Sequence, residues 1–441
     1  MLYFLGIGGI GMSALARYFK AKGSEVAGYD RTATPLTRRL EAEGISIHYV
    51  DDPAMIPQDV EFVVLTPAIP ADSKELNRLR ERGVRIVKRA EVLGMISRQH
   101  TSVAVAGSHG KTTTTALVSH IMMTARRRFS AFIGGIARNI DSNVVIGDER
   151  DEFVVMEADE FDRSFLQLSP NVSIVTSIDA DHLDIYGDYQ HVVEGFNQFV
   201  EKTSDRGLVV YHAGLPVQTS KPHITYGLND ADVVAANIRI VDGMTEFDAV
   251  LSGDEVVPIR MALYGDHNVQ NALAAIIACK SLGISVKDIQ EALLTFKGVQ
   301  RRFDIRVNHG KHVYIDDYAH HPEEMRATLL TARKAFPGKE LTVVFQPHLF
   351  TRTRDFMDEF AQVLSLADRV ILLDIYPARE KPIAGVTSAE MLKRITAADK
   401  MLCLKTELVN VIKNIDPELL ITMGAGDIND FVPQIEQLFN E

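Results

Sequence analysis

Short apolar runs alternate with amphipathic stretches over residues 1–99 of the chain. The stretches at 13–23 and 34–44 carry apolar residues at helical spacing and end on Gly, a common helix stop. The apolar runs have the length and composition of strands: LYFLGIG (2–8), EVAGYD (25–30), EFVVLTP (61–67) and VRIVKR (84–89). Strands that alternate with helices predict a parallel sheet.

The pattern restarts near residue 100 and again near residue 300. Residues 111–125 and 265–283 predict helices, and the strand-rich segment at 210–262 predicts a small side sheet. The other strands expected in these two series are SVAVAG (102–107), FVVMEADE (153–160), VSIVTSID (172–179), HVYIDDYA (312–319), LTVVFQP (341–347), DRVILLDIY (368–376) and LLITMGAG (419–426). This pattern therefore predicts an α/β fold with three domains in series, at 1–99, 100–298 and 299–441.

Composition and charge narrow the class of protein. A net charge of −12 argues against a nucleic-acid-binding surface, which needs clustered Lys and Arg. The two cysteines, Cys279 and Cys403, stand far apart and offer neither a disulfide framework nor a CxxC metal pair. The apolar N-terminus lacks a basic leader and a cleavage site, and no apolar run is long enough to span a membrane. We therefore expect a cytoplasmic protein without membrane partners.

The first glycine loop, GIGGIG, contains Gly6, Gly8 and Gly11 in the spacing G-x-G-x-x-G, between a strand and a helix. Such a loop lets a diphosphate approach the backbone and the positive end of the helix. Asp30 ends the second strand, where an acid that binds a ribose is expected. Taken alone, the loop predicts an NAD site or marks only a tight turn, and both interpretations stay open.

The second loop, VAVAGSHGKTTTTALV (103–118), resembles a phosphate loop with an unusual spacing, because only Ser108 and His109 separate its two glycines. The expected helix starts directly after the loop, as a phosphate loop requires. Lys111 can neutralise phosphate charge, and the hydroxyl of Thr112 can ligate Mg²⁺. The candidate nucleotide-binding residues are Gly107, Ser108, His109, Gly110, Lys111, Thr112 and Thr113.

Acidic residues follow the next two expected strands. They are Glu157, Asp159, Glu160 and Asp162 after the first, and Asp179, Asp181, His182 and Asp184 after the second. Parallel strands gather their carboxyl ends at one edge of a sheet, where carboxylates can hold Mg²⁺ on nucleotide phosphates. Singly, most of these residues would suit a helix cap or a solvated loop. Together they predict a magnesium site, with Glu157 and His182 as the preferred ligands.

With these motifs together, the chain resembles the Mur ligases, ATP-dependent amide-bond ligases of peptidoglycan precursor synthesis. The short phosphate loop is that family's own form. Further motifs resemble the branch that joins L-alanine to UDP-N-acetylmuramate: EADE (157–160), DHLDIY (181–186), GDHNVQNALAA (265–275), GVQRRF (298–303), DDYAHHP (316–322), FQPH (345–348), YPAREKPIAG (376–385) and GAGDI (424–428). The resemblance spans essentially the whole chain.

The resemblance implies a role for each domain. The first would be Rossmann-like and bind UDP, not NAD, through Gly6, Gly8, Gly9, Gly11 and Asp30. The central one would be a P-loop ATPase domain with a parallel sheet and a small side sheet. It would hold ATP with the second loop and with His267, Asn268 and Asn271, and Mg²⁺ with Thr112, Glu157 and His182. The third, Rossmann-like domain would close over ATP through Arg302 and Asp317 and bind the amino acid through Tyr318, His320 and Arg352.

The family's mechanism assigns catalysis to Lys111, Glu157, His182 and His320, the last as a proton acceptor or as an orienting group. The carbamylated Lys that some relatives use should be absent, since no Lys lies between Lys111 and Lys202. A ligase that recycles an intact tripeptide onto UDP-muramate is the nearest alternative. Folylpolyglutamate synthase and a nucleotide-sensing regulator without catalysis are more distant ones. The sequence leaves open monomer or homodimer, the order of substrate binding, the number of metal ions and the preference for alanine over serine or glycine.

Overall fold

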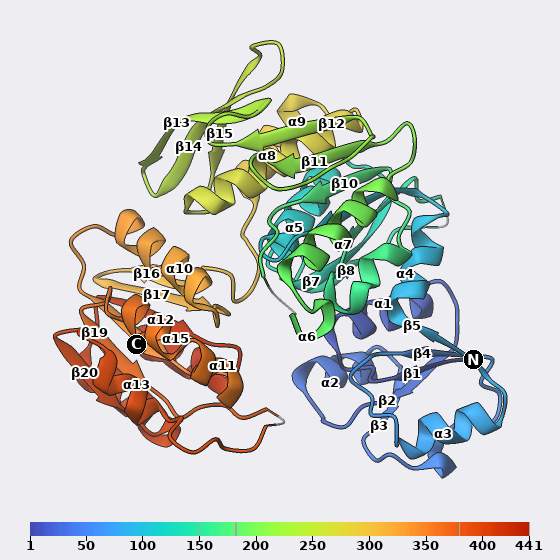
Figure 1. The fold of residues 1–441 in the computed structure, drawn as a ribbon, viewed down its shortest axis with the longest axis horizontal. Coiled ribbons are helices and arrows are strands. Elements are labelled where there is room, and N and C mark those ends of the chain that lie inside the picture. Colours follow the sequence, from blue (N-terminus) through green and yellow to red (C-terminus); the bar gives the residue numbers. More distant parts are fainter. Residues whose placement is uncertain (149, 181–182, 379, 441) are drawn as a thin grey trace. The chain divides into compact units, whose positions relative to one another are not determined.

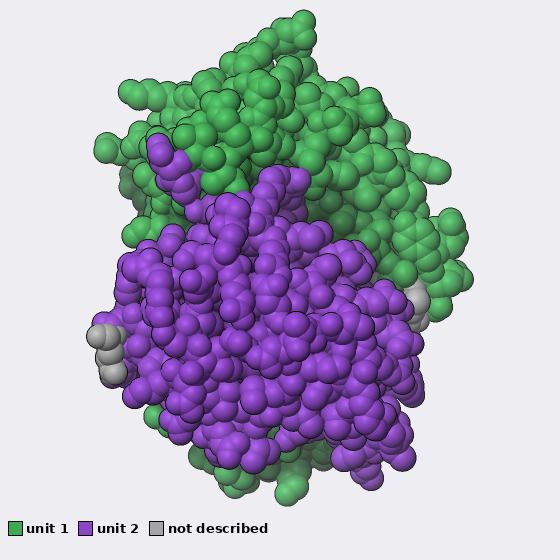
Figure 2. Space-filling view, turned by 90° about the vertical axis from the view of Figure 1, so that its left-hand side faces the viewer, with its two compact units in different colours: residues 1–241, 245–262, 268–297 green, residues 242–244, 263–267, 298–441 purple. Residues whose placement is uncertain are grey.

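The computed structural model describes residues 1–148, 150–180, 183–378 and 380–440. Three sheets form its framework (Figure 1). The chain divides into two compact units, coloured separately in Figure 2: residues 1–241, 245–262 and 268–297 form unit 1, and residues 242–244, 263–267 and 298–441 form unit 2. None of the described helices combines the length and apolarity that crossing a membrane requires.

The first sheet of unit 1 has the strand order β3-β2-β1-β4-β5, and all of its pairs are parallel. Its strands are β1 (Leu2–Leu5), β2 (Val26–Tyr29), β3 (Ser46–His48), β4 (Phe62–Leu65) and β5 (Arg85–Lys88). Its helices are α1 (Ile10–Ala21), α2 (Pro35–Ala42), α3 (Lys74–Glu81) and α4 (Arg89–Ser97), with a 3-10 turn, η1, at Pro53–Met55. The expected parallel sheet is confirmed, and β3 is an additional edge strand.

The second sheet of unit 1 has ten strands in the order β15-β14-β13-β12-β11-β10-β6-β9-β7-β8. They are β6 (Thr101–Ala106), β7 (Phe129–Ala137), β8 (Ser142–Val145), β9 (Phe153–Glu157), β10 (Val172–Val175), β11 (Leu208–His212), β12 (His223–Gly227), β13 (Val233–Val241), β14 (Met244–Val250) and β15 (Val256–Met261). The helices are α5 (Lys111–Thr124), α6 (Leu183–Tyr186), α7 (Tyr189–Glu201), α8 (Asp266–Ser281) and α9 (Val286–Thr295), with a 3-10 helix, η2, at Phe161–Gln167. The strands expected as a side sheet thus continue the central sheet.

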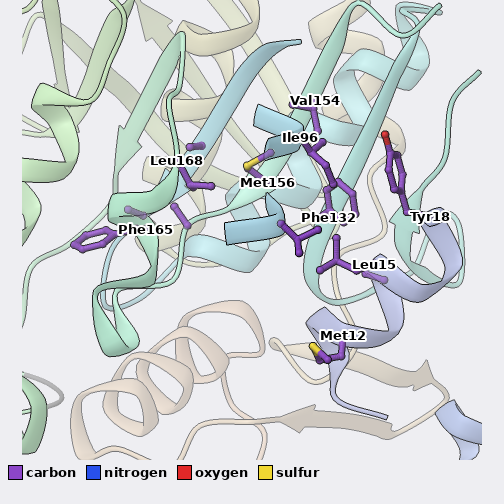
Figure 3. Packing of buried hydrophobic residues seen from close by; sticks show 14 of the residues in the cluster. Met12, Leu15, Tyr18, Ile96, Phe132, Val154, Met156, Phe165 and Leu168 are labelled. Atoms are coloured by element: carbon purple, nitrogen blue, oxygen red, sulfur yellow. The ribbon is translucent and has the colours of Figure 1, made fainter. Parts of the chain in front are cut away.

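One hydrophobic core joins the two sheets of unit 1. Met12, Leu15 and Tyr18 on α1 belong to the same buried cluster as Phe132 on β7 and Met156 on β9 (Figure 3). The rings of Tyr18 and Phe132 lie 5.2 Å apart. Because α1 begins at the first glycine loop, this shared packing connects that loop to the central sheet.

Unit 2 contains a six-stranded sheet in the order β16-β17-β21-β18-β19-β20. Its strands are β16 (Asp304–His309), β17 (His312–Asp317), β18 (Leu341–Phe345), β19 (Arg369–Leu372), β20 (Asp399–Leu402) and β21 (Leu419–Met423). The helices are α10 (Pro322–Ala335), α11 (Phe350–Asp355), α12 (Met357–Leu364), α13 (Ser388–Arg394), α14 (Leu408–Ile415) and α15 (Val432–Asn440), with 3-10 turns η3 (Lys405–Glu407) and η4 (Asp427–Phe431).

The first strand pair of unit 2 departs from the expected β-α-β order. β16 pairs with β17 in antiparallel fashion, from Asp304 opposite Asp316 to His309 opposite His312. A two-residue turn with Gly310 at φ 59° joins them. So short a connection can only reverse the chain direction, and the remaining pairs of the sheet are parallel.

Candidate active site

The phosphate loop joins β6 to α5. Gly107 has φ 137° and Gly110, directly before the helix, has φ 83°, conformations that favour glycine. A Cβ on Gly107 would lie 2.1 Å from the Thr176 hydroxyl, so a side chain has no room there. The loop therefore passes tightly against the end of β10, and its shortened spacing is compatible with a compact cradle ahead of the helix N-terminus.

The end of β10 supports this loop through polar side chains. The Ser177 hydroxyl accepts the backbone N–H of His109 at 2.8 Å, and the Ser108 hydroxyl accepts the backbone N–H of Asp179 at 2.8 Å. Thr176 donates to the carbonyl of Ala106 at 3.2 Å and also to that of His109. Neither Thr176 nor Ser177 was among the site residues expected from the sequence. The signal available for them was two hydroxyl residues directly after a strand that neighbours the loop.

Lys111 is enclosed by acceptors. Its ammonium donates to both carboxylate oxygens of Glu160 at 2.8 Å, to the carbonyl of Gly107 at 2.5 Å and to that of Ser108 at 3.3 Å. Burial disfavours the charged form of Lys111, but the adjacent carboxylates of Glu160 and Glu157 outweigh it and raise its pKa. The ammonium is therefore charged and held at the loop.

Glu157 lies on the other side of the phosphate loop from β10. β9 pairs with β6 in parallel, with Glu157 opposite Val105, two residues before the loop. One carboxylate oxygen of Glu157 accepts the backbone N–H of Gly134 at 2.9 Å. The strand order thus brings a carboxylate to the loop, as expected for a ligand of nucleotide-bound Mg²⁺.

The second preferred metal ligand, His182, lies outside the described residues, as does Asp181. In the described part of the chain, His, Cys, Asp and Glu form no group of three or more that could hold a metal ion by themselves. Mg²⁺ in nucleotide sites needs only one or two carboxylates, because phosphates and waters complete its shell. Glu157 and the hydroxyl of Thr112, the second residue of α5, therefore remain compatible with that ion.

Helix α8 contacts the same loop. The side-chain oxygen of Asn271 lies 2.6 Å from where a Cβ on Gly110 would be, and it accepts the Thr114 hydroxyl at 3.2 Å. The Asn271 amide donates to the side-chain oxygen of Asn268 at 3.3 Å. Both asparagines are buried, whereas His267, one residue earlier, is exposed. The structure thus brings Asn271 and Asn268 to the phosphate loop.

The first glycine loop is equally constrained. Gly6 has φ 84°, and a Cβ there would lie 2.4 Å from the Thr66 methyl group. The N–H of Gly8 donates to Asp30 at 2.7 Å, so this carboxylate holds the loop in the described structure. Gly9 is the N-cap residue of α1. Gly11 packs against the guanidinium of Arg89, a residue that the sequence analysis did not identify.

In unit 2, the expected amino-acid-binding residues come from two places: Tyr318 and His320 follow β17, and Arg352 lies in α11. Two guanidinium groups lie over the ring of Tyr318, those of Arg301 at 5.0 Å and Arg302 at 5.5 Å from its centre. The rings of Tyr318 and His320 lie 5.1 Å apart. Arg352 contacts His348 at 3.3 Å, and the ring of His348 lies 6.2 Å from that of His320. The structure therefore brings Tyr318, His320 and Arg352 into one cluster.

His348 joins this cluster although the sequence analysis had placed it only within a motif. Its ring stacks on Tyr376 with 5.7 Å between centres. Arg352 can only donate, so Nδ1 of His348 accepts and carries no proton. Burial, with the nearby His320 and Arg352, lowers the pKa of His348 to about 4. The imidazole is therefore neutral at pH 7.

His320 is neutral for a similar reason. Burial lowers its pKa, and the opposing effect of the Glu324 carboxylate is smaller. Nδ1 lies 3.0 Å from the carbonyl of Tyr318, which can only accept, so the proton of the neutral ring sits on Nδ1. This tautomer leaves a lone pair on Nε2, as a proton acceptor requires.

Asp317 and Arg302 have different environments. The Asp317 carboxylate accepts the N–H of Phe303 at 2.9 Å, the N–H of Ala319 at 2.8 Å and the Thr328 hydroxyl at 3.0 Å. It is only 6% exposed, and burial raises its pKa to about 6. Arg302 is partly exposed and lies 3.9 Å from Glu324. Asp317 thus organises the backbone around the cluster, while Arg302 has a guanidinium near the surface.

Three family models match successive parts of the chain. The Mur ligase family catalytic domain matches residues 1–101, the Mur ligase middle domain matches 105–279, and the Mur ligase glutamate ligase domain matches 301–426. The three matches follow the order of the three sheets.

Individual relatives match over their whole length. The UDP-N-acetylmuramate–L-alanine ligase of Christiangramia forsetii is 47% identical over 99% of this chain and 96% of its own. A crystal structure of the UDP-N-acetylmuramate–alanine ligase of Thermotoga maritima has a TM-score of 0.87 at 30% identity, over 100% of this chain and 99% of its own. A murein peptide ligase of Psychrobacter arcticus shares the fold, with a TM-score of 0.74 at 23% identity, over 100% and 98% of the two chains. On this sequence identity and coverage, the chain belongs to the Mur ligase family.

Proposed function

We propose that this chain is an ATP-dependent ligase that joins the amine of L-alanine to the carboxylate of UDP-N-acetylmuramate, with release of ADP and phosphate. The observation that carries the proposal is the phosphate loop, with Lys111 held at its carbonyls, in a chain that matches an alanine-adding relative from end to end. The 47% identity to that relative, against 23% to the murein peptide ligase at similar coverage, favours alanine addition over the tripeptide-recycling alternative. The reaction belongs to peptidoglycan precursor synthesis.

The proposed chemistry has two steps. The muramoyl carboxylate attacks the γ-phosphorus of ATP, which forms an acyl phosphate and releases ADP. The neutral amine of L-alanine then attacks the acyl carbon, and phosphate leaves as the amide forms. Because phosphoryl transfer depends on positioning and charge neutralisation, the charged ammonium of Lys111 is the principal catalytic group of the first step.

The residues around the phosphate loop fit a nucleoside triphosphate. Gly107 and Gly110 add no side chains to the loop, and α5 starts directly behind it, so backbone N–H groups and the helix dipole favour phosphate. Asn268 and Asn271 are the proposed contacts on the α8 side, and Glu160 is the carboxylate that holds Lys111 until phosphate takes its place. Glu157 and Thr112, with His182, are the proposed holders of Mg²⁺, which would neutralise charge on the phosphates.

The amino acid is assigned to the cluster in unit 2. Arg352 supplies a cation for its carboxylate, and Tyr318 and His320 border the same place. An ammonium ion must lose a proton before it can attack, and Nε2 of neutral His320 is the proposed acceptor. Arg302 is the proposed contact to ATP from this unit, whereas Asp317 positions the backbone beside it.

Two features support the remaining assignments. The first glycine loop and the N-terminus of α1 are the proposed site for the diphosphate of UDP, with Asp30 beside Gly8. The buried thiols of Cys279 and Cys403 are free, which suits the reducing cytoplasm as the place of the reaction.

The test measures phosphate release from ATP with Mg²⁺ and UDP-N-acetylmuramate, with and without L-alanine. Release that needs both substrates, together with UDP-muramoyl-alanine as the product, would support the proposal. If L-Ala-γ-D-Glu-meso-diaminopimelate supports release and L-alanine does not, the recycling reaction is established instead. If neither of these acceptors supports phosphate release, the substrate assignment is refuted.

A further inference from the structure

Arg89 connects the first glycine loop of unit 1 to the acidic loop that follows β9. It is the first residue of α4, and its guanidinium occupies the space beside Gly11, the third glycine of the first loop. A Cβ on Gly11 would lie 2.3 Å from Nη1 of Arg89 and 3.4 Å from its Cζ. Glycine at this position therefore makes room for a cation next to the first turn of α1.

The same guanidinium contacts the acidic loop that follows β9. Nη2 of Arg89 lies 2.8 Å from a carboxylate oxygen of Asp159, whose other oxygen accepts the N–H of Phe161 at 3.1 Å. The Arg89 side chain is 23% exposed and that of Asp159 is 37% exposed, so the pair is open to solvent on one side. Such a pair contributes little to stability and can exchange partners.

Helix α4 is fixed where it presents Arg89. A Cβ on Gly94 would lie 2.3 Å from the carbonyl of Gln167 at the end of η2, so helix and loop are in backbone contact. The Ser97 hydroxyl accepts the N–H of Ser169 at 3.2 Å. The helix is therefore held against the central sheet's acidic segment, and the position of the guanidinium follows from that contact.

The first turn of α1 contributes no negative side chain of its own. Within the described structure, the Gly9 N-cap offers no side chain, and the first turn of α1 contains no acidic residue. The helix dipole and the guanidinium of Arg89 thus bring two positive contributions to one place. The carboxylates nearby are those of Asp159, which pairs with Arg89, and Asp30, which accepts the N–H of Gly8.

We propose that Arg89 is a substrate-binding residue that takes up the diphosphate of the UDP substrate beside Gly11 and exchanges Asp159 for it. This inference rests on the proposed function, because it assumes a uridine diphosphate substrate at the first glycine loop. Its consequence is that binding of the UDP substrate releases the carboxylate of Asp159, which stands between Glu157 and Glu160 beside Lys111.

The experiment compares Arg89→Ala with Arg98→Ala, an exposed arginine at the other end of the same helix that donates to the backbone carbonyl of Gln167. Affinities for UDP and for uridine, which lacks the diphosphate, are measured by competition against UDP-N-acetylmuramate. Loss of a charge-assisted contact predicts a decrease in UDP affinity of about 10- to 100-fold for Arg89→Ala. Uridine affinity, the KM for ATP and the behaviour of Arg98→Ala should not change.

Three outcomes would overturn the inference. Undiminished UDP affinity in Arg89→Ala would remove the arginine from the site. Equal losses for UDP and uridine would mean that the substitution disturbs the fold of the loop. Asp159→Asn is expected to retain its affinity for UDP. If it loses as much UDP affinity as Arg89→Ala, the ion pair serves only to hold α4 in place. If the wild-type protein itself binds neither UDP nor UDP-N-acetylmuramate, the proposed function fails first, and the result is distinct from all three.

Discussion

Replacing Gly107 by alanine tests whether close packing against β10 selects the glycine of the phosphate loop. The new Cβ would lie 2.1 Å from the Thr176 hydroxyl and 2.8 Å from the backbone nitrogen of Ser177, well inside normal contact distance. The backbone nitrogen cannot rotate away, so the loop or β10 must shift. We expect overpacking of about 1–3 kcal/mol in addition to about 1–3 kcal/mol for a side chain at φ 137°.

Gly23→Ala provides the matched control. Gly23 follows α1 in the same unit, has φ 87° and would place its Cβ in open space. It should therefore cost only the backbone strain, about 1–2 kcal/mol. The chain contains no tryptophan, so urea unfolding is best followed by far-ultraviolet circular dichroism. Gly107→Ala should lose about 1–3 kcal/mol more than Gly23→Ala and should also raise the KM for ATP. Equal destabilisation of the two variants, with an unchanged KM, would refute the packing argument.

Three further predictions address the charged groups. Lys111→Ala should decrease phosphate release by about 100- to 1000-fold and leave UDP-N-acetylmuramate binding, measured by calorimetry, unchanged; near-normal turnover would exclude the phosphate loop from the reaction. Asp317 has a pKa of about 6 in the folded protein, above the ordinary value of 3.8, so the folded state binds more protons between these values and stability falls as the pH rises through them. Wild-type protein should lose about 2.5 kcal/mol between pH 4 and pH 7 that Asp317→Asn does not lose, and parallel pH profiles from urea unfolding would contradict this. Arg352→Ala should raise the KM for L-alanine by about 10- to 100-fold without raising that for ATP, whereas Arg354→Ala, in the same helix but exposed and paired with Asp355, should have no effect; a similar increase in both variants would remove the specific role of Arg352.

The order of strands and helices could be predicted because it depends on local patterns. Apolar runs bounded by Gly, Asp or Pro became strands, and the α/β class and the Mur ligase family are confirmed. The antiparallel hairpin of β16 and β17 was missed, because its two-residue turn is a weaker signal than the run of HVYIDDYA. That the side strands join the central sheet could not be predicted either, because the sequence does not show which strands pair along their edges.

The candidate site divides in the same way. The glycines at 6, 107 and 110 could be identified from the sequence, because positive φ values at a turn between a strand and a helix favour glycine. The assignments of Glu157, Arg352 and the other site residues to ligands remain predictions. His182, the second preferred metal ligand, lies outside the described residues and remains a prediction as well.

The sequence by itself determined where the two glycine loops lie, which residue types they contain and which helices follow them, because those features depend on neighbouring residues. Only the tertiary structure decided the partners of these loops. Glu160 faces Lys111, Ser177 caps the backbone of His109, and Arg89 fills the space beside Gly11. Each of these contacts joins segments that are distant along the chain. They exist because β9 and β10 flank β6 and because α4 packs against η2, and that arrangement follows from burial of one shared core.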